Sequence, residues 1–141
     1  MLRRLGRSCA FGVLAAGVGL LVGAMPLWAH HAFGVQFDPS QAITVKGVIT
    51  EVKWENPHMW VYVDVTDKSG KVASWGFEAN GPASVIRSGV KPDVLKPGQE
   101  VTIHGFRARD SSRNFGTVRE VVLADGRSLI IGPGGKDPEP R

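Results

Sequence analysis

Cysteine is almost absent from this chain, which holds one cysteine in 141 residues. That residue, Cys9, has no partner within the chain, so no internal disulfide can stabilise the fold. Enzyme signatures are missing as well: the sequence has no Gly-x-Ser-x-Gly elbow, no phosphate-binding loop and no spacing that makes a catalytic triad. We therefore expect a domain held by its hydrophobic core, and a binding protein rather than an enzyme, with an uncharacterised hydrolase as a remote alternative.

Acidic residues are absent from the first 29 positions, which contain three arginines followed by an apolar stretch of small residues over 9–25. Ala29 supplies the small residue that signal peptidase needs before its cut, so the pattern predicts a signal peptide over 1–29. Ala24 is a second possible cleavage site. An uncleaved anchor is the alternative, because the segment 9–28 is just long enough to span a bilayer. We expect an exported protein, periplasmic or secreted, with no membrane span after cleavage.

The basic charge of the chain belongs largely to this segment. Three of the 17 basic residues precede position 30, which leaves 14 against 13 acidic residues and a net charge of +1. So small a charge does not indicate a nucleic-acid surface. The remaining 112 residues suffice for one small domain. The expected partners are a small molecule or another protein of the cell envelope.

Alternating apolar and polar residues dominate the mature part and predict strands rather than helices. The predicted strands lie at 43–54, 59–66, 72–78, 100–108, 117–123 and 128–131, with one short helix at 83–88. Gly47, inside the first strand, predicts a bulge or a sharp bend.

This order predicts a mainly β fold: a small barrel of five to six strands like the oligonucleotide/oligosaccharide-binding (OB) fold, with its helix between strands 3 and 4. A β-sandwich is the rival fold. The expected organisation is an N-terminal signal helix within 1–29, the OB-like domain over 30–131 and a disordered tail over 132–141.

Five short motifs spread over the mature chain resemble those of one bacterial family of small exported proteins, classed as a domain of unknown function. They are His30-His31-Ala-Phe33, Phe37-Asp38, Asn56-Pro57-His58-Met-Trp60, Trp75-Gly-Phe77-Glu78 and Leu95-Lys-Pro-Gly98. The double histidine and the Asn-Pro-His turn are the most specific of these. The resemblance implies an exported OB-like barrel and carries no established activity or catalytic residue.

Two adjacent histidines would begin the mature chain if cleavage follows Ala29. A free α-amino group and the imidazole of His30 can chelate Cu(II), with His31 beside them and His58 as the third ligand. Asp38 or Glu55 could then add an oxygen ligand or orient an imidazole from outside the coordination sphere. A solvated terminus and a turn-capping histidine are the alternative. The sequence thus offers copper binding as a second hypothesis.

Aromatic and basic residues offer a ligand surface. Trp60 and Tyr62 share one face of the second predicted strand, opposite its valines, so this face is expected to point outward. Aromatic rings there could stack on sugars or bases. Arg107, Arg109 and Arg113, with Asn114, form a small basic patch around the loop before the fifth strand, where an anionic group could bind. Packing of both rings beneath the N-terminal segment, and a merely solvated loop, are the alternatives.

Overall fold

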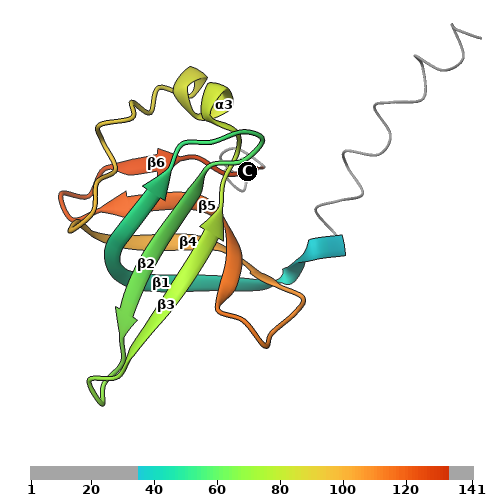
Figure 1. Ribbon diagram of the computed structural model, residues 1–141, viewed down its shortest axis with the longest axis vertical. Helices are drawn as coiled ribbons and strands as arrows, with labels where there is room; N and C mark the ends of the chain where they lie inside the picture. Colours follow the sequence, from blue (N-terminus) through green and yellow to red (C-terminus); the bar gives the residue numbers. More distant parts are fainter. Residues whose placement is uncertain (1–34, 134–141) are drawn as a thin grey trace, which may run out of the picture. The chain divides into compact units, whose positions relative to one another are not determined.

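Six strands and one short helix make up the fold in the computed structural model, which describes residues 35–133 (Figure 1). Their bounds are β1 (Phe37–Lys53), β2 (Trp60–Thr66), β3 (Val72–Glu78), α3 (Pro82–Arg87), β4 (Glu100–Ala108), β5 (Phe115–Leu123) and β6 (Ser128–Ile130). The prediction of a mainly β domain with a short helix between the third and fourth strands is confirmed. The signal peptide, the predicted signal helix, His30 and His31 lie outside the described residues. So do residues 134–141 of the predicted tail.

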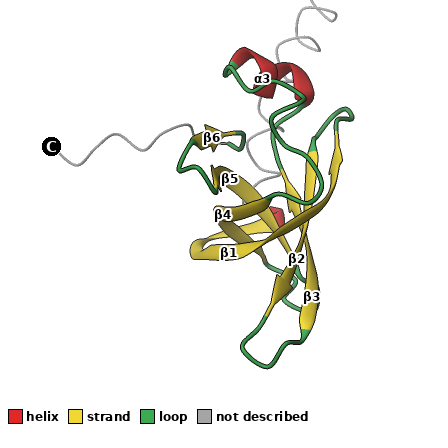
Figure 2. Ribbon diagram, turned by 90° about the vertical axis from the view of Figure 1, so that its left-hand side faces the viewer, coloured by secondary structure: helices red, strands yellow, loops and turns green. Residues whose placement is uncertain are grey.

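The strands join into one sheet with the order β3-β2-β1-β4-β5-β6. Neighbours in this order are antiparallel, and β3 also pairs in parallel with the start of β5. This additional pairing joins Gly76 to Phe115 and Glu78 to Thr117, so five strands close into a hydrogen-bonded ring. β6 pairs with the later part of β5 (Figure 2).

The long strand β1 serves two neighbours, because its residues from Ala42 to Val48 pair with β4 and those from Val48 to Lys53 pair with β2. Gly47 lies next to this change of partner. A Cβ at Gly47 would lie 2.5 Å from the carbonyl oxygen of Asp64 on β2, so only glycine allows the strands to approach this closely. The register of β1 against β2 shifts two residues later, between Ile49 and Glu51.

The core forms inside the ring by strict alternation along the strands. On β2 and just before it, Met59, Val61 and Val63 are completely buried, whereas Trp60 and Tyr62 on the opposite face are only partly buried. The predicted assignment of faces on this strand is therefore confirmed. Other strands and the helix complete the core with Val45, Ile49, Phe77, Val85, Val101, Ile103, Val118, Val121 and Ile131.

The C-terminal end of the domain extends past the predicted boundary at 131. Gly132 was expected to start a disordered tail, but it is buried and its N–H bonds the carbonyl of Arg119 at 3.1 Å. This bond extends the contact between the β6 end and β5. Within residues 35–133, no helix is long and apolar enough to cross a bilayer.

Candidate ligand-binding site

The outer face of β2 and β3 carries aromatic and small residues in register. Trp60 lies opposite Glu78, Tyr62 opposite Gly76, and Asp64 opposite Ser74. A Cβ at Gly76 would lie 3.2 Å from a ring carbon of Tyr62, closer than most side chains tolerate. The missing side chain of Gly76 therefore makes room for the ring of Tyr62 on the neighbouring strand.

Four rings from three strands form a continuous row across this face, which we call the aromatic row. The ring centroids of Phe37 and Phe115 are 5.5 Å apart, and those of Phe115 and Trp60 are also 5.5 Å apart. Trp60 and Tyr62 follow at 6.2 Å with nearly parallel planes. Phe37 is buried while Tyr62 is partly exposed, so the row runs from the interior to the surface.

Beside this row lies a hollow of about 550 Å³, the aromatic groove. That volume falls within the range of small-molecule sites. Five of its residues are aromatic or glycine and four are polar. They come from the segment before β1, from β2 and β3, from the β4–β5 loop and from the start of β5. The lining comprises Gln36, Trp60, Tyr62, Ser74, Trp75, Gly76, Arg113, Asn114 and Phe115.

One wall of the groove is the loop between β4 and β5, which is tied down at three places. The carbonyl of Asn114 accepts a hydrogen bond from the N–H of Gly76 at 3.1 Å, and the carbonyl of Ser111 accepts one from Arg107 at 3.2 Å. Inside the loop, a carboxylate oxygen of Asp110 accepts the hydroxyl and N–H of Ser112 at 2.6 and 3.0 Å. These bonds, the hydroxyl first, lower the pKa of Asp110.

The predicted basic residues lie near the groove but contact other partners. The Arg107 guanidinium covers the ring of Trp75 at 5.0 Å from its centroid. Arg109 lies 3.9 Å from a carboxylate oxygen of Asp38. Neither lines the groove, whereas Arg113, further along the same loop, does. Of the four residues predicted to bind a ligand, Trp60 and Tyr62 are brought together in the groove.

The third predicted metal ligand, His58, lies just before β2, two residues before Trp60. Its Nδ1 lies 2.7 Å from a carboxylate oxygen of Glu78, and Gln36 donates to the other oxygen at 3.4 Å. His58 is about half exposed while Glu78 is largely buried. The carboxylate that orients this imidazole is thus Glu78, whereas Asp38 accepts hydrogen bonds from Ser40 and Gln41.

This contact fixes the chemistry that His58 can offer. A neutral imidazole that donates Nδ1–H to a carboxylate keeps Nε2 as a free acceptor and a possible metal ligand. No group of three His, Cys, Asp or Glu side chains that could hold a metal occurs among residues 35–133. His30 and His31 lie outside that range, so the structure does not place them relative to His58.

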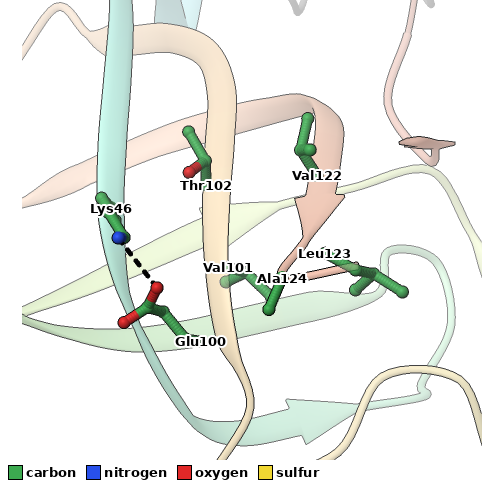
Figure 3. A pocket seen from close by; sticks show the side chains of 7 residues that line it. All are labelled: Lys46, Glu100, Val101, Thr102, Val122, Leu123 and Ala124. Carbon is green, nitrogen blue, oxygen red and sulfur yellow. Dashed lines mark ion pairs between the residues drawn. The ribbon is translucent and has the colours of Figure 1, made fainter. Parts of the chain in front are cut away.

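A second hollow on the ring, of about 210 Å³, provides a comparison (Figure 3). We call it the β4 hollow. It is lined by Lys46, Glu100, Val101, Thr102, Val122, Leu123 and Ala124, none of them aromatic. Lys46 and Glu100 form an ion pair of 2.8 Å across it, with both side chains more than half exposed.

Sequence reasoning missed three parts of the groove: Gln36, Ser74 and Phe115. Phe115 could have been noticed, because it is the one aromatic residue in an otherwise polar loop and directly precedes a strand. Gln36 and Ser74 carry no such signal. Their role depends on the register of β3 and on the start of β1, which sequence alone does not specify.

Taken together, the fold and groove define a small, mainly β domain with a mixed aromatic and polar surface hollow. Comparison with known families assigns it: the family described as "Family of unknown function (DUF6152)" matches residues 17–118, and the chain belongs to this family. Every residue that lines the aromatic groove lies within the matched range. No curated protein and no solved structure matches the chain.

Proposed function

We propose that this protein is an exported, OB-like β-barrel without enzymatic activity, which binds a small ring-containing ligand in the aromatic groove. The observation that carries the proposal is the aromatic row, in which Trp60, Tyr62 and Phe115 converge from two strands on one polar-edged hollow. Signal-peptide features at the N-terminus support export.

The strand pairing supports the OB-like interpretation. In the OB fold, a five-stranded Greek-key barrel binds its ligands on the face of strands 2 and 3, between the loops that flank it. Here five strands form a ring through the parallel pairing of β3 with β5, with α3 between β3 and β4. The groove lies over β2 and β3 beside the β4–β5 loop, at the position where such folds bind.

Binding can be tested by NMR on the mature protein with a panel of ring compounds: cellobiose, trigalacturonate, indole and benzoate. We expect at least one to shift the amide signals of Gly76, Asn114 and Phe115. Trp60→Ala should weaken that binding about tenfold to a hundredfold, because a stacking contact contributes about 1–3 kcal/mol. The matched control is Thr102→Ala in the β4 hollow, which should bind normally.

Two NMR results would contradict the groove as the ligand site. If all four compounds at millimolar concentration leave these amides unshifted, or if the shifts map to the β4 hollow, the ligand site is wrongly assigned. Unfolding by urea should be followed for both variants, so that a loss of binding is not mistaken for a loss of fold.

A second candidate function is copper binding through His30, His31 and His58, with the free N-terminal amine as a further ligand. The contact between His58 and Glu78 favours it, because the carboxylate orients the ring and leaves Nε2 available. The proposal requires cleavage after Ala29. Mass spectrometry of the secreted protein tests that step: a chain beginning at Met25, or one that keeps its signal, would exclude it.

Copper titration of the chain that begins at His30 tests the ligands themselves. The absorption and magnetic-resonance spectra of bound Cu(II) should change in His58→Ala and, more weakly, in Glu78→Gln. His104→Ala is the matched control, since this histidine contacts Thr44 on another part of the sheet. Identical spectra for the wild type and His58→Ala would remove His58 from the site.

A further inference from the structure

We propose that the ligand of the aromatic groove is a short oligosaccharide that carries carboxylates, with Arg113 as the partner of a carboxylate. This inference rests on the proposed function and specifies its ligand. Three features of the groove carry it: the sign of its charge, the distribution of its polar groups and the position of its rings.

Charge is the first feature. Arg113 is the one residue among those lining the groove that carries a formal charge at neutral pH. Its guanidinium has only donors, arranged to pair with the two oxygens of a carboxylate. A second cation, Lys53, lies 5.2 Å from the centroid of Tyr62, at the outer end of the aromatic row, and 3.8 Å from a carboxylate oxygen of Glu51.

The nearby carboxylates are already engaged with groups of the protein. Asp64 accepts the hydroxyl of Ser74 at 2.6 Å, and Asp110 accepts two hydrogen bonds from Ser112 within its own loop. Glu78 contacts His58 and Gln36. These three carboxylates keep their charge, and Arg113, after the hydrogen bonds from Ser112, contributes to lowering the pKa of Asp110. None of them lines the groove, so Arg113 is the charged group that an incoming carboxylate meets inside it.

The polar groups are the second feature, and they favour a sugar over an aromatic acid. Gln36, Ser74 and Asn114 come from three separate segments and surround the rings. Amide and hydroxyl side chains both donate and accept hydrogen bonds. Ser74 and Gln36 each donate one hydrogen bond within the protein, to Asp64 and Glu78, and keep further hydrogen-bonding capacity for a ligand. A sugar has hydroxyls around its whole ring and can reach groups on several sides, whereas an aromatic acid has its polar atoms at one end.

The rings are the third feature. Trp60 and Tyr62 are nearly parallel and partly exposed, and Gly76 has no side chain that would cover the Tyr62 ring. Apolar C–H faces of a pyranose can pack on such rings while the hydroxyls remain at the polar edge. With a volume of about 550 Å³, the groove has room for more than a single small ring.

The test uses trigalacturonate and its fully methyl-esterified form, which has the same rings without the charge. Titration of the mature protein, followed by tryptophan fluorescence at low salt, should show the acid binding about tenfold more tightly than the ester. Arg113→Gln should remove this difference between the acid and the ester. Arg87→Gln on α3, which removes the same charge from an exposed site outside the groove, is the matched control.

The possible outcomes distinguish the acidic oligosaccharide proposed here from the ring-binding function on which it rests. Equal binding of acid and ester, or a preference that survives in Arg113→Gln, would overturn the role of charge and leave the ring-binding function standing. Binding of benzoate or indole without binding of either trisaccharide would overturn the sugar and again leave that function standing. If no ring compound binds, the proposed function itself is wrong.

Discussion

The aromatic groove and the β4 hollow lie on the same ring of strands but differ in the side chains that line them. In the β4 hollow, the charged groups satisfy each other, because Lys46 and Glu100 form an ion pair, and the other side chains are aliphatic or threonine. In the groove, four partly exposed rings lie beside an arginine and two amides. The charged side chains of the β4 hollow therefore pair with each other, whereas the groove offers rings, an arginine and amides to a ligand.

Backbone architecture explains where each surface occurs. The β4 hollow lies where β1, β4 and β5 pair as regular antiparallel neighbours, so short side chains cover the sheet. The groove lies where β3 meets β5 in parallel, at the closure of the ring, and where the β4–β5 loop is bonded to Gly76. Closure brings together residues that are distant in sequence, which is how a set of unrelated side chains comes to line one hollow.

The largest effect should come from the core beneath the two hollows. Phe77 faces inward between Gly76 and Glu78, and Val101 faces inward beneath the β4 hollow; both are almost completely buried. Phe77→Ala should lower the free energy of unfolding by about 3–5 kcal/mol. Val101→Ala should lower it by about 2 kcal/mol, since fewer apolar atoms are lost. Urea denaturation measures both decreases in the free energy of unfolding. Equal decreases would mean that the core at Val101 relaxes less around the missing atoms than the core at Phe77 does.

Filling the groove should have the next largest effect. Gly76→Val adds branched carbon where even a Cβ would lie 3.2 Å from Tyr62 and 3.9 Å from Phe115. The Tyr62 ring must move to make room, so we expect an oligosaccharide titration to show binding weakened tenfold or more. Thr102→Val in the β4 hollow, a change of similar shape, should leave the affinity unchanged. Normal binding by Gly76→Val would show that the ligand does not use this part of the surface.

Local sequence patterns predicted the strands well because alternation is a local property. The bounds of β3 and β4 agree with the prediction, and the inward valines and outward rings of β2 follow directly from a period of two. The beginning of β1 was missed: the strand starts at Phe37, not at 43. The register of this first part of β1 against β4 shifts between Phe37 and Ala42, so it lacks the regular alternation that a strand prediction needs.

The candidate site was only partly predictable because it depends on contacts between distant segments. Trp60 and Tyr62 could be paired from spacing within one strand. Phe115 joins them only through the parallel pairing of β3 with β5. In the same way, the carboxylate beside His58 was sought at Asp38 and Glu55, but Glu78 reaches it from the neighbouring strand.

A smaller effect is expected from the charges of the β4 hollow. Lys46 and Glu100 are 66% and 56% exposed, and exposed ion pairs contribute about 0–1 kcal/mol. A double-mutant cycle with Lys46→Met and Glu100→Gln should give a coupling energy in this range that decreases with added salt. Ligand affinity should stay constant in both variants. A change in affinity would mean that the two hollows are not independent.

The smallest effect concerns two acidic turns, one near each hollow. Asp38 follows Phe37, at the buried end of the aromatic row, and the hydroxyl of Ser40 is the main cause that lowers its pKa to about 2. Asp125 lies in the turn after β5, and the backbone N–H of Arg127 is the main cause that lowers its pKa. Lowered values mean that each ionised carboxylate stabilises the fold above its ordinary pKa of 3.8 and that this contribution is lost as the pH falls below it.

Carbon-detected NMR titration of the two carboxyl groups measures these values directly. Ser40→Ala should raise the pKa of Asp38 and leave that of Asp125 unchanged, because the lost hydroxyl acts only within its own turn. A titration of Asp38 at its ordinary value in the wild type would contradict the bonded turn. Since both groups stay ionised above about pH 5, neither can produce a pH dependence of ligand binding near neutrality.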